Sequence, residues 1–248
     1  MKDLNEELYS CALTKEYYSL SKDRIAKYIE LLENEKGLLL DIGSGDGIIA
    51  ERIQSKTGFK VIAIDSIKKN VLAARKKGVE AKQVDLNHGL PFKKNSFDCI
   101  LAGEVLEHLL DPESVLSECK RVLKPQGRLI VSVPNIAAWY NRFLLFKGHL
   151  PLWVDSGSKK NYGTRFKQAY GHVKAFTLKA LKELIKEKGF EVQEVKGTGL
   201  NPTYFAGTKR ESLQASLFYF FDKLLALKPS LASTIIIKAV KPGRRTNG

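Results

Sequence analysis

Apolar residues gather in short continuous runs that alternate with helical segments along most of the chain. The runs expected to form strands are residues 38–42, 61–64, 81–84, 99–102, 129–133, 190–195 and 234–240. A strand that is apolar at every position is buried on both faces, which is typical of a parallel sheet covered by helices. The pattern therefore predicts an α/β fold with helices on both faces of a mostly parallel sheet.

Three helices are marked by apolar spacing and by residues that begin or end a helix. Residues 17–33 carry apolar side chains at helical spacing. Asp111 precedes a proline at the start of a second helix, which the turn at residues 124–127 ends. Thr177 caps a third helix, which ends at Gly189.

We expect a single domain with a core at about residues 17–135 and 173–241. Two insertions, at about 136–172 and 200–230, do not fit the repeating unit. The first is aromatic and basic, with Trp139, Tyr140, Arg142, Phe143, Leu144, Leu145, Phe146, Lys147 and Trp153. The second contains a candidate apolar helix. Such insertions form lids or substrate walls, or they only pack over an apolar edge, and both roles stay open.

The composition is that of a globular protein with an excess of positive charge. Lys and Arg number 41 against 27 acidic residues, which gives a net charge of +14. This charge attracts polyanions, although the basic residues are scattered in pairs as on any lysine-rich surface. The three cysteines form no CxxC pair, so we expect reduced packing residues. The polar N-terminus and the lack of an apolar run of about 20 residues predict a cytoplasmic protein.

A glycine-rich turn follows the first predicted strand and leads into a helix. It reads Asp41, Ile42, Gly43, Ser44, Gly45, Asp46 and Gly47. Glycines there permit positive φ and let a ligand approach the backbone. The third glycine comes one residue too early for the dinucleotide motif G-x-G-x-x-G. Asp41 and Asp46 would repel a pyrophosphate, so the turn favours S-adenosylmethionine, whose amino and sulfonium groups are cationic.

Polar and small residues follow the next strands at the same predicted edge of the sheet. Asp65 ends the second strand, where a carboxylate accepts hydrogen bonds from both ribose hydroxyls. Asp85 follows the third strand and is a candidate acceptor for the adenine amino group, with Leu86 against the ring. Gly103 would let the cofactor approach the tip of the fourth strand.

Three segments resemble motifs of class I S-adenosylmethionine-dependent methyltransferases of the type 11-like group: residues 41–47, 97–109 and 121–130. The family usually has Lys-Pro-Gly-Gly where this chain has Gln126, which leaves the shape of that turn open. The resemblance implies a Rossmann-like, seven-stranded, mostly parallel sheet with an antiparallel last strand at 234–240. It also implies cofactor contacts at Asp41, Gly43, Gly45, Asp65, Asp85 and Gly103.

A candidate metal or catalytic site lies in the second of these segments. Glu104, Glu107 and His108 at i, i+3 and i+4 would share one helical face and hold a divalent cation. The triplet is similar to one in ubiquinone-pathway O-methyltransferases and small-RNA 2′-O-methyltransferases, where it is linked to Mg²⁺. Besides His108, His172 is a candidate catalytic base or a further ligand. Alternatively, Glu104 lines the cofactor pocket while Glu107 and His108 make structural hydrogen bonds.

Three functions follow from these features. The first is a methyltransferase acting at oxygen on a small-molecule or lipid-linked acceptor, with the aromatic insertion as its wall or as a peripheral membrane contact. The second is an RNA 2′-O-methyltransferase, because positive charge and aromatic residues suit RNA. The third is a non-catalytic, methyltransferase-like binding protein, which we would expect to lack the turn glycines or Asp65. The oligomeric state stays open.

Overall fold

The computed structural model describes residues 21–164, 167–200 and 213–243, and one sheet organises them. Its strands are β1 (Lys36–Ile42), β2 (Gly58–Asp65), β3 (Glu80–Gln83), β4 (Phe97–Gly103), β5 (Leu123–Pro134), β6 (Glu191–Thr198) and β7 (Thr234–Val240). Their order is β3-β2-β1-β4-β5-β7-β6. β7 is antiparallel to both neighbours, and the other pairs are parallel. The predicted fold class is confirmed.

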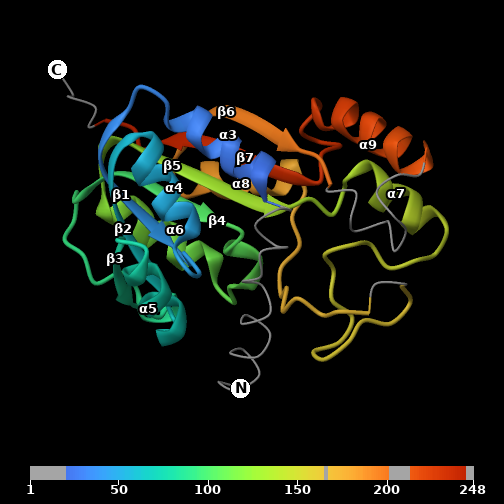
Figure 1. Ribbon diagram of the computed structural model, residues 1–248, viewed down its shortest axis with the longest axis horizontal. Coiled ribbons are helices and arrows are strands. Elements are labelled where there is room, and N and C mark those ends of the chain that lie inside the picture. The colour runs from blue at the N-terminus through green and yellow to red at the C-terminus, as the bar shows by residue number, and fades with distance from the viewer. Residues whose placement is uncertain (1–20, 165–166, 201–212, 244–248) are drawn as a thin grey trace.

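Helices cover both faces of the sheet, which explains the continuous apolar runs (Figure 1). Leu39 packs with α3 (Lys22–Leu32), α4 (Ile48–Lys56) and α5 (Lys68–Lys76) on one face. Leu40, the next residue, packs with α6 (Pro112–Val122) and α8 (Leu178–Glu187) on the other. Successive side chains of a strand point to opposite faces, so both must be apolar.

The predicted helix starts at Asp111 and Thr177 are confirmed. The Asp111 side chain accepts a hydrogen bond from the Ser114 amide (2.9 Å), and the Thr177 hydroxyl accepts one from the Ala180 amide (3.2 Å). Each cap satisfies an amide that has no partner inside the helix. Cys99 and Cys119 are buried free thiols, as expected, whereas Cys11 and residues 17–20 lie outside the described residues.

The two insertions contain a helix each. α7 (Trp139–Phe146) lies in the first and α9 (Leu213–Ala226) in the second. Buried amides anchor the first insertion, since Asn135 donates to the Ala232 carbonyl (2.8 Å) and Asn141 accepts from the Leu152 amide (2.8 Å). Among the described helices, none is long and apolar enough to cross a membrane.

The sequence left open the shape of the turn that contains Gln126. In the structure the backbone of Gln126 lies in the left-handed region. Its φ is +64°, and its amide donates to the Lys241 carbonyl (2.9 Å). The glutamine therefore adopts a conformation that favours glycine, and the turn keeps its place at the start of the long strand β5.

Candidate active site

The glycine-rich turn after β1 requires glycine for two separate reasons. Gly43, Gly45 and Gly47 have φ of +64°, +55° and +77°. A Cβ on Gly43 would lie 2.5 Å from a Val105 methyl group, and one on Gly47 would lie 2.5 Å from the Ala74 Cβ. The turn therefore combines left-handed backbone with close packing, and α4 begins directly after it.

Asp41 is a buried carboxyl whose Oδ2 has no hydrogen-bond partner among the described residues. Burial, together with the negative charge of Asp65, raises the pKa of Asp41 to about 8. A buried carboxyl in this state is stabilised by a cation or by a proton. Asp41 at the end of β1 therefore fits a cofactor with a cationic amino group.

Asp65 is largely occupied by donors of the protein itself. Its Oδ2 accepts from the Gly45 amide (2.9 Å), and its Oδ1 accepts from the Ile67 amide (2.9 Å) and the Asn70 side chain (3.1 Å). A carboxylate offers about four lone-pair sites. Asp65 thus fastens the glycine turn to β2 and retains capacity for about one further hydrogen bond, rather than for two ribose hydroxyls.

The remaining predicted cofactor contacts have structural roles of their own. Asp85 is exposed and caps the short 3₁₀ helix η2 (Leu86–His88), accepting from the amide of Asn87 (3.0 Å). Leu86 is half-buried against the core. A Cβ on Gly103 would lie 2.8 Å from the Tyr28 hydroxyl, so this glycine makes room for Tyr28. Ser44 donates its amide to the Ile64 carbonyl (3.0 Å).

The predicted helical face of Glu104, Glu107 and His108 is wrong. Glu104 has φ +57°, which interrupts a helix, and only the 3₁₀ turn η3 (Leu106–His108) follows. The Glu104 carboxylate instead pairs with Arg24 of α3 (2.8 Å) and accepts from the Ser132 hydroxyl (2.8 Å). Glu104 therefore belongs to a network with Arg24 and Ser132 and does not share a helical face with Glu107 and His108.

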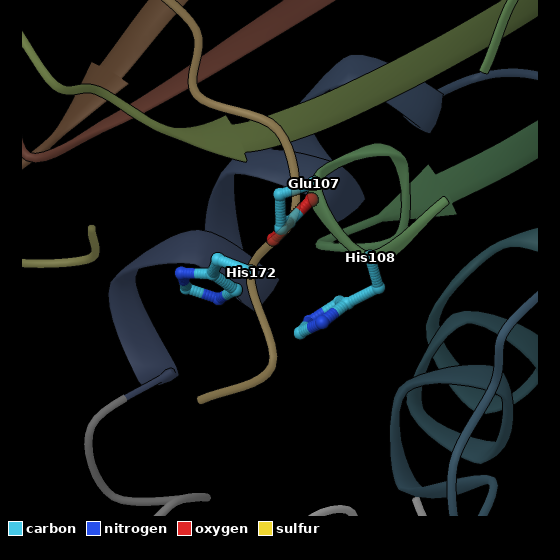
Figure 2. A group of neighbouring side chains, drawn as sticks. All are labelled: Glu107, His108 and His172. Carbon is cyan, nitrogen blue, oxygen red and sulfur yellow. The ribbon is translucent and has the colours of Figure 1, made fainter. Parts of the chain in front are cut away.

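His172 joins Glu107 and His108 instead (Figure 2). One ligand atom of each side chain lies within 4.8 Å of those of the other two. The chain reaches this place because the Val173 and Lys174 amides both donate to the Glu107 carbonyl (2.8 and 3.0 Å). The first insertion thus returns to the sheet against η3 and brings its last residue to the site.

Glu107 is the most unusual member of this group. Its side chain is 2% exposed, and neither carboxylate oxygen has a hydrogen-bond partner in the part of the chain that the structure describes. Burial and the charge of Glu104 hold the pKa of Glu107 well above its usual range. Burial and the neighbouring His172 lower the pKa of His108 to about 4. His108 is therefore neutral at physiological pH.

Backbone carbonyls fix the orientation of both imidazoles. His108 Nδ1 lies 3.2 Å from the Gly171 carbonyl, and His172 Nδ1 lies 2.8 Å from the Trp153 carbonyl. A carbonyl only accepts, so in the neutral form of either ring Nδ1 carries the hydrogen and Nε2 carries the lone pair. Histidines oriented by carbonyls in this way are typical of metal and proton-transfer sites.

Asp155 and Tyr170 support His172, and the sequence analysis missed both. Asp155 Oδ2 accepts from the amides of Tyr170 and His172 (both 2.9 Å). The Tyr170 ring stacks on the His172 ring at 5.7 Å. A signal was present, because Asp155 is the single acidic residue between positions 135 and 172. An isolated acid in a basic segment indicates a structural or chemical role.

Few residues of the predicted aromatic wall lie near these histidines. Trp153 does, because its ring packs against Tyr170 at 5.1 Å. Trp139 instead donates to Asp222 of α9 (2.8 Å). Phe143 and Phe146 are exposed. The two ends of the insertion therefore serve different surfaces.

Several curated proteins with similar sequences are named ubiquinone biosynthesis O-methyltransferases. The human mitochondrial ubiquinone biosynthesis O-methyltransferase is 28% identical over 212 residues, which make up 80% of this chain and 54% of that protein. The Roseobacter denitrificans enzyme of that name is 29% identical over 177 residues (67% and 65%). The Xylella fastidiosa enzyme is 35% identical over 119 residues (46% and 47%). The chain spans about half the length of most of these relatives.

Solved structures with the same fold include methyltransferases and one enzyme of another kind. A Thermotoga maritima SAM-dependent methyltransferase has a TM-score of 0.63 at 20% identity, covering 95% of this chain and 99% of its own. The [4+2]-cyclase SpnF has a TM-score of 0.57 at 20% identity (89% and 82%). The fold alone therefore does not determine the reaction. A family described as "Methyltransferase domain" matches residues 14–195. The chain thus belongs to this methyltransferase family and shares the fold of solved S-adenosylmethionine-dependent methyltransferases.

Proposed function

We propose that the chain transfers a methyl group from S-adenosylmethionine to an oxygen atom of a small-molecule or lipid-like acceptor. One observation carries the proposal. The buried Glu107 has two carboxylate oxygens without partners among the described residues, beside His108 and His172. Such a group is suited to accepting a hydrogen bond from the hydroxyl of an acceptor. The relatives named ubiquinone biosynthesis O-methyltransferases support an oxygen acceptor of this class.

The residues at the ends of β1 and β2 fit the cofactor. When bound, S-adenosylmethionine supplies an already activated methyl group. Asp41 would be ionised beside the cationic amino group, and Asp65 would use its remaining lone pair on one ribose hydroxyl. The floor of the cofactor site would be formed by Gly43, Ser44, Gly45 and Gly47, and Gly103 would contact the cofactor at the tip of β4. Asp85 and Leu86, which follow β3, would contact the adenine.

His172 is our candidate for the base. A hydroxyl acceptor must lose its proton as the methyl group is transferred, and a neutral imidazole nitrogen within reach can take it. His172 Nε2 carries a lone pair, and Tyr170 and the Trp153 carbonyl hold the ring. His108, whose pKa is lowered to about 4, is a weak base and is better suited as a ligand or orienting group.

Glu107, His108 and His172 also fit a divalent cation. A cation would supply a lower pKa for a hydroxyl bound to it. One carboxylate and two imidazoles suit Mn²⁺, Fe²⁺, Co²⁺ or Zn²⁺, whereas Mg²⁺ prefers oxygen ligands. Glu104, which would have added an oxygen ligand, pairs with Arg24. We therefore place Mg²⁺ below these ions as an occupant.

Calorimetric titration followed by a methyl-transfer assay tests the proposal. The protein is titrated with S-adenosylmethionine, its demethylated product and NAD, each with and without Mn²⁺ or Mg²⁺. Methyl-labelled cofactor is then supplied with hydroxylated benzoates, the same compounds carrying a prenyl tail, and RNA oligonucleotides. Glu107→Gln is compared with the exposed Glu187→Gln as a matched control.

We expect adenosyl ligands to bind, a phenolic oxygen to be labelled, and Glu107→Gln to reduce labelling by about 10²-fold or more without weakening cofactor binding. Labelling of RNA would contradict the small-molecule acceptor and identify the 2′-hydroxyl of RNA as the methyl acceptor. Binding of NAD alone would contradict the cofactor assignment. Equal labelling by both variants would remove Glu107 from the site.

A further inference from the structure

Helix α9 turns an apolar stripe toward solvent. Leu217, Phe220, Phe221 and Leu224 follow helical spacing and therefore share one side of the helix. Their exposed fractions are 49%, 64%, 53% and 53%. Asp222, the acid of this helix, is completely buried. A surface helix of a globular protein normally has the opposite arrangement, with its apolar stripe on the core and its charges in water.

Helix α7 adds to the same region. Phe146 is 88% exposed, and Phe143 and Leu145 are more than half exposed. The two helices are joined, because Trp139 donates to Asp222 (2.8 Å) and its ring lies 5.1 Å from that of Phe218. Figure 1 shows both helices at the end of the molecule opposite β3. We call the exposed apolar side chains of α7 and α9 the α7–α9 face.

The exposed charges that α7, α9 and their flanking residues carry have one sign. Arg142 and Lys147 are exposed on or beside α7, and Lys223 and Lys228 are exposed on or beside α9. The Lys147 ammonium lies 4.6 Å from the centre of the Phe143 ring. Between residues 135 and 154 the sequence has no acidic residue, and between 213 and 231 it has only the buried Asp222. An apolar surface with a basic rim complements an anionic lipid surface.

We propose that the α7–α9 face docks on the surface of a bilayer that contains anionic phospholipids. Phenylalanine and leucine side chains enter the acyl boundary while lysine and arginine meet the headgroup phosphates. A second copy on this face would bring like charges together, which opposes association. Single-stranded RNA is recognised by stacking its bases on aromatic rings, and the leucines of this face do not stack with bases. The proposal does not depend on methyl transfer.

Vesicle co-sedimentation tests the docking. The purified chain is mixed with phosphatidylcholine vesicles, with and without phosphatidylglycerol, at low and high salt. The double variant Phe146→Ser/Phe220→Ser removes one ring from each helix, and Leu72→Ser on α5, 47% exposed, is the matched control. We expect the wild-type chain and the control to bind the anionic vesicles, less so at high salt. The double variant should bind at least about tenfold more weakly.

Cofactor titration of each variant checks that it is folded, and sedimentation velocity gives its oligomeric state. Three results would overturn the proposal: no binding of the wild-type chain to anionic vesicles, equal binding by the double variant, or a wild-type dimer that the double variant dissociates. The last result would assign the face to a second copy. None of these results bears on whether the chain transfers methyl groups.

Discussion

The proposed cofactor edge (the glycine-rich turn with Asp41 and Asp65) and the proposed acceptor side (Glu107, His108 and His172) are built in different ways. At the cofactor edge, Gly45 and Asp65 are hydrogen-bonded across 20 positions of sequence, within one strand–helix–strand unit. At the acceptor side, His108 and Gly171 meet across 63 positions. Apolar packing under the glycine turn holds the cofactor edge in place. Hydrogen bonds to Asp155 and to backbone carbonyls hold the acceptor side in place. The sheet therefore provides the proposed cofactor edge, and the insertion brings the proposed base, His172, to Glu107 and His108.

The largest effect that separates the two regions should come from His172→Ala. If His172 is the base, turnover falls by about 10²–10⁴-fold, while the affinity for S-adenosylmethionine is unchanged. The measurement is kcat with the acceptor found by the labelling assay, alongside calorimetry with the cofactor. His149→Ala, an exposed histidine of the same insertion, is the matched control. A parallel loss of cofactor affinity would show that the two regions are not separable.

Gly47→Ala should lower the stability of the protein at the glycine-rich turn. The new Cβ would meet the Ala74 Cβ at 2.5 Å, at a φ of +77°. Left-handed strain of about 1–2 kcal/mol and overpacking of about 1–3 kcal/mol should together lower the free energy of unfolding by about 2–5 kcal/mol. Gly78→Ala isolates the strain, because φ is +79° there and no atom lies within 4 Å. Denaturant unfolding of both variants measures the difference, and equal losses would exclude the packing contribution.

This contrast also explains what could be predicted from sequence. Strands such as 234–240 were predicted because burial on both faces leaves a continuous apolar run, a signal that is local. Residue types at the cofactor edge follow from the same regularity, since parallel strands end at one edge. The departure of Glu104 from this group was not predictable, because the expected helix depended on Glu104 adopting an ordinary negative φ. The buried ion pair with Arg24 is a tertiary contact that no spacing reveals.

Asp41→Asn should change how the stability of the protein depends on pH. The folded-state pKa of Asp41 is raised to about 8, so the folded chain retains a proton that the unfolded chain releases above about pH 4. Between pH 4 and 8 the wild type therefore loses stability as pH rises, by up to about 1.4 kcal/mol per pH unit. The carboxamide that replaces the carboxyl does not titrate, so from pH 6 to 8 the variant should gain about 2 kcal/mol relative to the wild type.

Unfolding of the cofactor-free proteins at several pH values measures this difference, in which the other titrating groups cancel. Cofactor calorimetry should show weaker binding by Asp41→Asn, since the carboxylate that faces the cationic amino group is gone. A pH-independent difference between the two proteins would mean that Asp41 is ionised in the folded chain, with a cation already supplied by the protein.

Asp155→Ala should loosen the acceptor side while leaving the sheet intact. The amides of Tyr170 and His172 would lose their acceptor, which weakens local structure by about 1–2 kcal/mol. Hydrogen exchange at these two amides should accelerate about tenfold, and turnover should fall, with the cooperative unfolding of the core little changed. Asp111→Ala, which removes the cap of α6, should accelerate exchange at the start of α6 only. Unchanged exchange at residues 170–172 would exclude Asp155 as their support.

The smallest effect should come from Gln126→Gly, in the turn near the start of β5. Glycine relieves about 1–2 kcal/mol of left-handed strain but adds about 0.5–1 kcal/mol of unfolded-state entropy, so the net gain is about 0.5 kcal/mol, or a Tm rise of about 1–2 °C. Gln126→Ala retains the strain and should leave Tm unchanged, and Gln126→Asn should fall between them. This order would show that the apolar sheet holds a strained turn with little loss, because its two flanking strands are fixed by packing on both faces. If Gln126→Gly lowered Tm, the glutamine side chain would itself stabilise the turn, and the core would depend on polar contacts as the insertion does.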